Sequence, residues 1–397
     1  MKGWRVIAGG ACLVAGSLVA QQDLVLFEPL YREAIERREG SLGTDHPKTA
    51  ESLTNLALLL RNTGRAAAAE PLLRRALAIH EKAFGAEALP VAEDLTNLAS
   101  ALEAKGDSAG AELLYRRALA IQEKALGPQH PGLAAGLSKV AAAIEARGDL
   151  ASAEPLYRRA LAIQEKALGP AHPEVGISLN NLGLLLENQG QPAAAEPLYQ
   201  RAVSILEKTL GPGHPETGTA LNNLGGVLQA RGELAAAEPL YRRALALTEQ
   251  ALTPDHPRVA VSAANLASLL EVKGEGKAAE PLYRRAATIQ EKNGDPEAVA
   301  TWNRLAFLLR AKGDLAGAEP VVRRALALAE KKFGPQHAEV ARQSINLAWL
   351  LEAKGNRPAA AALYRRALPI AEKALGAEDP LVQEIRKKLA APGGRVR

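Results

Sequence analysis

Cysteine and aromatic residues are scarce in this 397-residue sequence. The one cysteine, Cys12, lies in an apolar stretch near the N-terminus and has no partner for an intramolecular disulfide. Aromatic residues make up 4% of the chain, whereas alanine is abundant. This composition excludes a core built on large rings and favours helices that pack closely through small side chains.

Catalytic signatures are also missing. No Gly-x-Ser-x-Gly nucleophile elbow is present. Residues 274–277, Gly-Glu-Gly-Lys, share only their last two positions with a phosphate-binding loop. Such a loop needs a glycine five residues before the Gly-Lys pair and a serine or threonine after it, where this chain has Glu271 and Ala278. We expect neither enzymatic activity nor a bound cofactor.

The charge balance gives no sign of a nucleic-acid partner. The net charge of +5 is mild for this length, and glutamate is interleaved with the frequent arginines. A nucleic-acid-binding face is usually a segregated basic patch, so the mixed pattern indicates a solvated surface held by salt bridges.

The N-terminus has the layout of an export leader. Lys2 and Arg5 precede an apolar run of 15 residues that ends at Ala20. This run is short for a membrane-spanning helix and is typical of a secretory signal peptide over residues 1–20. We therefore expect export to the periplasm or the medium, after which the chain retains no cysteine.

Two alternatives to a cleaved leader remain open. Leu18 is large for the position two before the cleavage site, so the segment is also compatible with an uncleaved membrane anchor. The residues before Cys12 lack the large apolar side chain typical of a bacterial lipoprotein site, which argues against lipidation. Membrane association is expected only if the leader is retained.

A repeated segment organises the rest of the chain. Its full form, AEPLYRRALAIQEKALG, spans Ala153–Gly169. Copies follow in steps of 42 residues, with one step of 39 between Glu280 and Glu319. A fixed period of this size indicates a repeat architecture. The glutamates that head the copies are Glu28, Glu70, Glu112, Glu154, Glu196, Glu238, Glu280 and Glu319, with Ala361 in the last copy.

Each repeat predicts two antiparallel helices. Leu221, Leu224 and Leu228 recur at the spacing of one helical face, and Gly232 marks the end of that helix. Small and apolar residues then recur at helical spacing over residues 237–248, which predicts a second helix.

Turns of the form Gly-Pro-x-His-Pro join the repeats. The proline opens the next first helix, where no backbone N–H is needed. Histidines one repeat apart are separated by about 8–10 Å and cannot share an ion bound at about 2 Å. We therefore predict turn residues and no metal site. These histidines are His46, His130, His172, His214, His256 and His337.

The spacing of Leu224-Gly225, Leu228, Ala237, Tyr241 and Ala244 resembles the tetratricopeptide repeat. The 42-residue period, AEPLYRRAL and the His-Pro turn resemble the kinesin light chain class of these repeats. The resemblance covers roughly Asp23 to the C-terminus. It implies an all-α, right-handed superhelical solenoid. The heptad coiled coil of kinesin light chains is absent, so no motor role is carried over.

The expected organisation has three parts. A signal peptide over residues 1–20 precedes a solenoid over 21–390, and a flexible tail occupies 391–397. Within the solenoid, we expect an N-terminal cap helix at 24–38, eight helix pairs at about 48–376 and a C-terminal cap helix at 380–389. A monomer is expected.

Twin arginines recur in the second helices. Glu154 precedes Arg158 by four residues, the favourable order for an ion pair along a helix. We interpret these arginines as surface salt-bridge partners. The alternative is a basic row on the outer face that binds acidic lipid or polymer.

A polar row occupies one position of the first helices, directly before the Leu-Gly or Leu-Ala pair. The resemblance implies that this position faces a concave groove. An amide can donate and accept, so the row could hold the backbone of an extended peptide. Alternatively, these side chains join neighbouring first helices. The row consists of Asn55, Asn97, Lys139, Asn181, Asn223, Asn265, Arg304 and Asn346.

The last two first helices add aromatic and basic residues at groove-facing positions. Phe307 and Trp349 are equivalent, and Arg310 stands where most repeats have glutamate. This set indicates a site for an apolar side chain flanked by acidic residues or a C-terminal carboxylate. Packing of the two aromatic rings on each other is the alternative. The set comprises Arg304, Phe307, Arg310, Arg342, Asn346 and Trp349.

The function predicted from the sequence is a non-catalytic scaffold that binds a peptide segment of another protein. A structural or assembly role in the cell envelope, and a regulatory arm for a separately encoded enzyme, are the alternatives. The partner's identity does not follow from the sequence.

Overall fold

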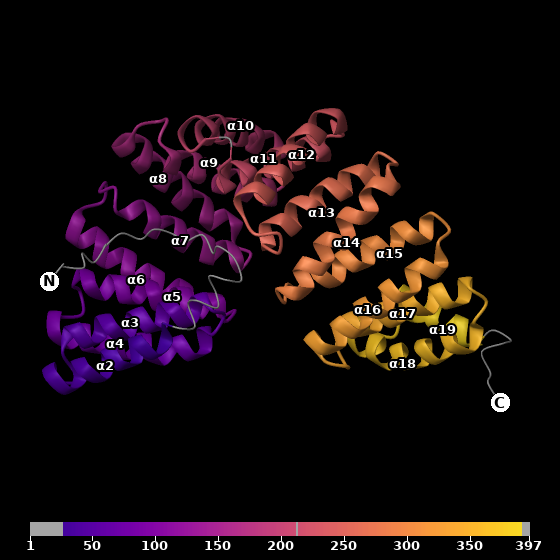
Figure 1. Cartoon of the computed structure of the whole chain (residues 1–397), viewed down its shortest axis with the longest axis horizontal. Coiled ribbons are helices and arrows are strands. Elements are labelled where there is room, and N and C mark those ends of the chain that lie inside the picture. Colours follow the sequence, from indigo (N-terminus) through magenta and orange to yellow (C-terminus); the bar gives the residue numbers. More distant parts are fainter. Residues whose placement is uncertain (1–26, 212, 391–397) are drawn as a thin grey trace. The chain divides into compact units, whose positions relative to one another are not determined.

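The structure is a computed structural model that describes residues 27–211 and 213–390 (Figure 1). The predicted leader, the tail at 391–397 and the start of the helix expected at 24–38 lie outside these ranges. The described residues form helices and contain no strand, which confirms the all-α prediction.

First and second helices alternate along the chain. The first helices are α3 (Pro47–Asn62), α5 (Leu89–Ala104), α7 (Leu133–Ala146), α9 (Pro173–Asn188), α11 (Pro215–Ala230), α13 (Pro257–Val272), α15 (Ala298–Ala311) and α17 (Ala338–Ala353). The second helices are α4 (Ala66–Phe84), α6 (Ser108–Leu126), α8 (Leu150–Leu168), α10 (Pro192–Thr209), α12 (Leu234–Ala251), α14 (Gly276–Lys292), α16 (Leu315–Phe333) and α18 (Arg357–Leu375).

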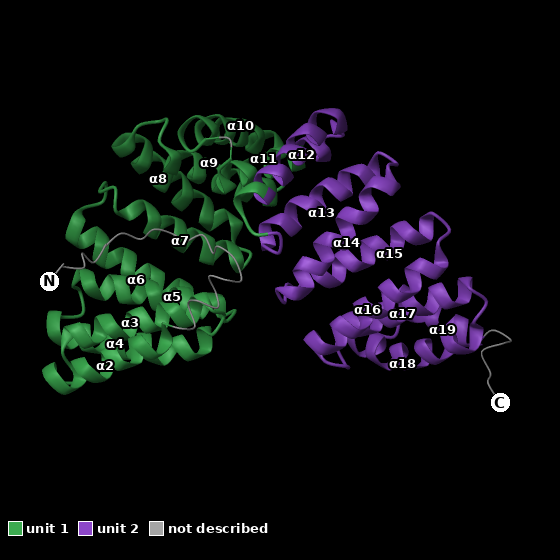
Figure 2. Cartoon of the chain, viewed as in Figure 1, with its two compact units in different colours: residues 1–227, 250–253 green, residues 228–249, 254–397 purple. Residues whose placement is uncertain are grey.

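One further helix lies at each end of this series. The first is α2, which spans Glu28–Leu42 and packs on α3. The second is α19, which spans Pro380–Ala390 and packs on α18. The chain divides into two compact units, residues 1–227 with 250–253 and residues 228–249 with 254–397 (Figure 2).

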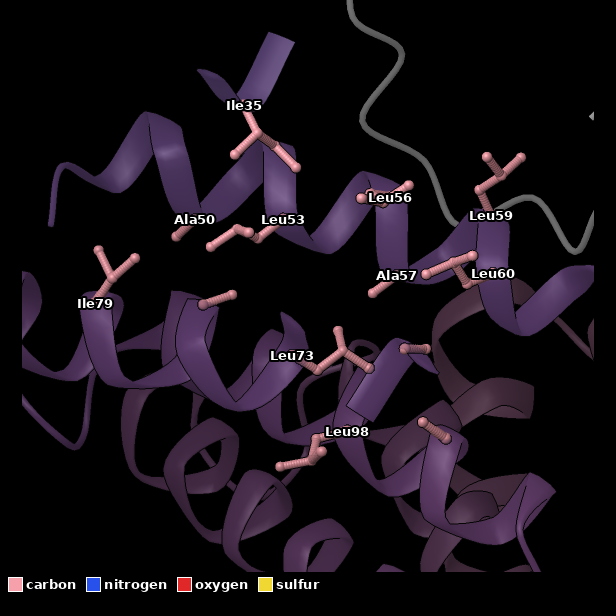
Figure 3. Close-up of a cluster of buried hydrophobic side chains, with 13 residues drawn as sticks. Ile35, Ala50, Leu53, Leu56, Ala57, Leu59, Leu60, Leu73, Ile79 and Leu98 are labelled. Carbon is pink, nitrogen blue, oxygen red and sulfur yellow. The ribbon is translucent and has the colours of Figure 1, made fainter. Parts of the chain in front are cut away.

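Small and branched side chains build the core of the first unit. Ile35 of α2 packs into a cluster with Ala50 and Leu53 of α3 and with Leu73 of α4 (Figure 3). Alanines at the helix contacts are fully buried, as Ala57 and Ala76 are. Small contact residues let the helices approach closely, as the scarcity of aromatic residues suggested.

The glutamate at the head of most second helices joins two repeats. Glu112 Oε1 accepts from Arg116 Nε at 2.8 Å, and Glu112 Oε2 accepts from Arg147 Nη1 of the next repeat at 2.5 Å. The Arg116 hydrogen bond is the largest of the effects that lower the pKa of Glu112. The same two-sided contact recurs at Glu28, Glu70, Glu154, Glu238, Glu280 and Glu319.

The second arginine of each pair reaches the preceding second helix. Arg159 Nη1 donates to Glu123 Oε1 at 2.5 Å, and Arg159 Nη2 donates to the backbone oxygen of Pro128 at 2.8 Å. Arg117 pairs with Glu81 in the same way. These arginines therefore act as salt-bridge partners within each unit.

Most histidines of the inter-repeat turns are helix caps; His130 makes a similar backbone bond, but Gly132 is the residue before α7. The Nδ1 atom of His172 accepts from the backbone N–H of Glu174 at 3.2 Å, at the first turn of α9. This bond satisfies one of the backbone donors that a helix N-terminus leaves open. The sequence indicated a turn residue but not this capping role. Equivalent bonds are made by His46, His130, His214, His256 and His337.

A buried tyrosine ties the two helices of most repeats together. Tyr199 Oη of α10 donates to Glu187 Oε2 of α9 at 3.0 Å. Burial and the nearby carboxylate raise the pKa of this tyrosine far above its usual value. The same bond is made by Tyr115, Tyr157, Tyr283 and Tyr364 to the glutamate twelve residues earlier.

Candidate protein-binding site

The tyrosine–glutamate pair is absent from the seventh repeat, as it is from the first repeat, which holds Leu73 and Arg61 at these positions. Val322 replaces the tyrosine on α16, and Arg310 replaces the glutamate on α15. Tyr283 and Tyr364, in the repeats before and after, keep their carboxylate partners. Because valine is much shorter than tyrosine, the space that a phenol ring fills elsewhere is not filled here.

A pocket of about 350 Å³ lies at this seventh-repeat position, entirely within the second unit. Ala318 and Val322 of α16 line it and are buried. Three first helices supply the remaining lining residues: Glu271 of α13; Asn303, Arg304, Ala306, Phe307 and Arg310 of α15; and Asn346, Trp349 and Leu350 of α17. The structure thus brings together five of the six residues predicted for this end of the chain.

Phe307 and Arg310 form an exposed aromatic–basic pair beside the pocket. The Phe307 side chain is 56% exposed. The Arg310 guanidinium lies 5.5 Å from the centre of its ring, within the range of a cation–π interaction. Among the described residues, Arg310 has no carboxylate partner. Its hydrogen-bonding capacity is therefore available to a ligand.

The electrostatics of the pocket are positive. Arg304 Nη1 donates to Ser268 Oγ at 3.3 Å and has no ion-pair partner among the described residues. Glu271, the only acidic lining residue, accepts from the Tyr283 hydroxyl at 2.6 Å. Burial raises the pKa of Tyr283 to about 12, so this hydroxyl remains a donor at neutral pH. Two arginines thus face one carboxylate that already has a partner.

Four other polar or aromatic side chains differ in their placement. Asn346 and Trp349 line the pocket and are half-buried. The Oδ1 atom of Asn303 is buried without a hydrogen-bond partner among the described residues, which leaves an acceptor at the pocket. Arg342, which was predicted with this group, lies outside the pocket and pairs with Glu339 at 3.1 Å.

The polar row makes contacts between neighbouring first helices in the first unit. Asn223 Nδ2 donates to Asn180 Oδ1 at 2.9 Å. Lys139 Nζ lies 3.5 Å from Ser100 Oγ and 5.3 Å from the centre of the Tyr115 ring. These contacts support the structural alternative at both positions.

The remaining members of the row differ in exposure. Asn55 is exposed, and the other three, Asn97, Asn181 and Asn265, are half-buried. The described contacts do not join them into one site.

Val322 is the most consequential of the lining residues that the sequence prediction did not include. The signal was present, because Val321-Val322 replaces the Leu-Tyr of the neighbouring copies. The predicted residues all lie on first helices, so the replacement of tyrosine by Val322 on the second helix α16 was not predicted.

The described residues were also considered for metal binding and for membrane-spanning helices. Within residues 27–211 and 213–390, no group of three or more His, Cys, Asp or Glu side chains is placed to hold a metal ion. Over the same ranges, every helix falls short of the length and apolar character needed to cross a bilayer.

The helix pairs define a repeat protein of the helical solenoid class. The tetratricopeptide repeat model matches residues 8–82, 53–124, 132–208, 181–250, 216–292 and 297–373. These matches cover most of the chain, which therefore belongs to the tetratricopeptide repeat family. No curated protein matches the chain significantly.

Several solved structures are similar to this chain. TPR-like repeats attributed to a kinesin light chain of Podosopora anserina are 30% identical, with 52% of this chain and 97% of that chain covered and a TM-score of 0.46. BtubC (BKLC) from P. vanneervenii is 24% identical over 57% of this chain and 89% of that one, with a TM-score of 0.46. A Rap protein complexed with Competence and Sporulation Factor is 16% identical over 86% and 98%, with a TM-score of 0.52.

Proposed function

We propose that this protein is a non-catalytic scaffold that binds a peptide segment of a partner protein. Its tetratricopeptide repeats and its fold similarity to Rap proteins indicate a protein–protein interaction scaffold. The more specific proposal, that the ligand is a peptide segment, rests on the seventh-repeat pocket, where Val322 and Arg310 replace the tyrosine–glutamate pair.

The pocket's chemistry supports one kind of ligand. Phe307 and Trp349 offer apolar surface, and aromatic side chains beside arginine are common anchors of protein interfaces. Arg304 and Arg310 favour a carboxylate, which arginine can hold through two parallel hydrogen bonds. The proposed ligand is an apolar side chain flanked by acidic residues or followed by a C-terminal carboxylate.

The test is titration of the protein with short fluorescent peptides that end in Asp-Glu-Phe, monitored by anisotropy. The variant Val322→Tyr with Arg310→Glu restores the residues of the neighbouring repeats and fills the pocket. It should abolish binding while leaving the melting temperature unchanged or higher. A peptide with Asn-Gln-Phe, blocked at its C-terminus, is the matched ligand control. Full binding by the filled-pocket variant would contradict the proposal.

The polar row has its own test. Asn181→Ala with Asn223→Ala should weaken peptide binding by about 0.5–1.5 kcal/mol for each neutral hydrogen bond lost. The melting temperature separates the alternatives, because Asn223 already bonds Asn180. A large stability loss with unchanged affinity would assign the row to helix packing.

We also propose that the protein acts outside the cytoplasm after removal of its leader. Lys2, Arg5 and the apolar run to Ala20 support this proposal. Protein isolated from the native host should begin at or near Gln21. Soluble cytoplasmic protein with an intact Met1 would exclude it.

A further inference from the structure

The helix α2 is a second helix whose own first helix is not among the described residues. In α4, the next second helix, Ala69, Leu73 and Ala76 are fully buried, and α4 packs on α3, its first helix. The equivalent surface one repeat earlier is more open. Phe27, directly before α2, is the equivalent of Ala69 and is 49% exposed, and Leu30 of α2, the equivalent of the half-buried Leu72, is 58% exposed.

Tyr31 and Asn55 mark the same uncovered region. Tyr31 of α2 is half-buried, and its hydroxyl has no hydrogen-bond partner among the described residues. The equivalent tyrosines, such as Tyr199, donate to a glutamate of their own first helix. Asn55 of α3 is exposed, whereas Asn223, its equivalent on α11, contacts the preceding first helix.

The other repeats show what covers such a surface. In the fourth repeat, Gly183 of α9 lies so close to Tyr199 that an added Cβ would sit 2.7 Å from the ring. Four residues later, Glu187 accepts from the hydroxyl of Tyr199. The pattern Leu-Gly/Ala-x-x-Leu-Glu recurs in α5, α9, α13 and α17. The small residue of this pattern leaves room for the tyrosine ring of the second helix, and its glutamate accepts the hydrogen bond from the tyrosine hydroxyl.

We propose that a surface formed by Phe27, by Leu30 and Tyr31 of α2, and by the Asn55 side of α3 docks an amphipathic helix of a partner chain. That helix carries the pattern Leu-Gly/Ala-x-x-Leu-Glu and takes the place of a first helix. This surface resembles the one that a second helix presents to its own first helix in the other repeats. The contacts made in those repeats therefore indicate which residues a docked helix needs. Binding of this kind places the apolar face of a helix in a groove between two others.

A second copy of this chain fits the surface less well. Its own α2 presents Leu30 beside Phe27, and not the small residue that the Tyr31 ring requires. The carboxylate of Glu28 is already bonded to Arg32 and Arg65. A symmetric α2–α2 contact would therefore leave the Tyr31 hydroxyl without its acceptor.

The experiment uses a fluorescent peptide with the sequence of residues 173–188 and the chain beginning at Gln21. We expect saturable binding by anisotropy. In the peptide, Gly183→Leu should abolish binding because the side chain would overlap the tyrosine ring. Glu187→Ala should weaken binding about tenfold through loss of the hydrogen bond to the carboxylate.

Protein variants locate the binding. Phe27→Glu should abolish it, and Tyr31→Phe should make the unmodified peptide and its Glu187→Ala variant bind with equal affinity. The filled-pocket variant Val322→Tyr with Arg310→Glu should bind this peptide normally, which separates this surface from the proposed peptide pocket. Unchanged binding by Phe27→Glu, with an unchanged melting temperature, would overturn the proposal.

Two further outcomes would show that the surface is occupied by something other than a partner helix. If the chain that retains residues 1–20 fails to bind while the chain from Gln21 binds, the occupant is the chain's own N-terminal segment. If sedimentation shows a dimer that Phe27→Glu dissociates, the occupant is a second copy. Either result overturns the proposal as stated.

Discussion

The Nδ1 atom of His80 lies 2.6 Å from Oδ2 of Asp94, and both side chains are buried between α4 and α5. Burial raises the pKa of the Asp94 carboxyl. Two repeats later the equivalent positions hold Gln164 and Ser178, whose side chains are hydrogen-bonded at 2.5 Å. The same junction thus holds different hydrogen-bonded polar pairs in the two repeats.

Breaking this pair should destabilise the first unit. Asp94→Ala leaves the buried His80 ring without its acceptor, and we expect a loss of about 1–3 kcal/mol in urea unfolding. The double variant His80→Gln with Asp94→Ser copies the pair found two repeats later and should recover most of that loss. Equal destabilisation by the double variant and Asp94→Ala would show that the pairing is not interchangeable.

Low pH should weaken the glutamate hydrogen bonds and ion pairs that join neighbouring repeats. The hydrogen bonds of Glu70 to Lys105 and of Glu154 to Arg158 lower the pKa of each carboxyl below its usual 4.5. A lowered pKa in the folded state contributes stability above the unfolded value, and this stability is lost as the pH falls through the folded pKa.

The measurement is the urea midpoint between pH 7 and pH 2. We expect little change above about pH 5 and a progressive fall below the usual glutamate pKa. Glu154→Gln should lower the midpoint at pH 7 and flatten the acid dependence. An identical acid profile in wild type and Glu154→Gln would assign the acid sensitivity to other carboxylates.

Gly183 should resist replacement by alanine, although Ala99, Ala267 and Ala348 hold the equivalent position in other repeats. A Cβ at Gly183 would lie 2.7 Å from the Tyr199 ring, so Gly183→Ala should cost about 1–3 kcal/mol of unfolding free energy. Gly40 is the control because nothing lies within 4 Å of an added Cβ. Gly40→Ala in α2 should be neutral or stabilise by about 0.5–1 kcal/mol. Equal effects of the two substitutions would refute the packing explanation.

The two tryptophans of the described residues should respond differently to a quencher. Trp302 is 2% exposed and its Nε1 donates to Glu291 at 3.0 Å, whereas Trp349 is half-buried at the pocket. Acrylamide should quench the fluorescence of Trp349 and spare Trp302. Quenching that survives Trp349→Phe undiminished would show that Trp349 is shielded.

The repeat period and the helical spacing were sufficient to predict the fold. The Gly-Pro-x-His-Pro turns placed the starts of α9 and α11 correctly, at Pro173 and Pro215, but the prediction was wrong for α7, which begins at Leu133, two residues after Pro131. The capping by His172 was not predicted, because a histidine side chain is a rarer cap than serine or aspartate. Sequence spacing shows where a turn lies but not which ring nitrogen faces the backbone.

The site was less accessible to sequence reasoning than the fold. Arg310 and Trp349 were identified because they break a column of equivalent residues on one helix. The pocket itself depends on Val322 of a different helix, and its size depends on how closely α15, α16 and α17 pack. Arg342 was grouped with them by position on α17, yet its side chain pairs with Glu339.

The two-sided bond of Glu112 has a consequence for how such a chain can change in length. One carboxylate oxygen accepts a hydrogen bond from Arg116 of the same helix, and the other accepts from Arg147, 35 positions later. Most copies thus supply one half of such a contact and complete another. Loss or duplication of a whole 42-residue segment recreates the same bonds at the new boundary. Homologous genes should therefore differ by whole segments, and a partial insertion should disrupt the array locally.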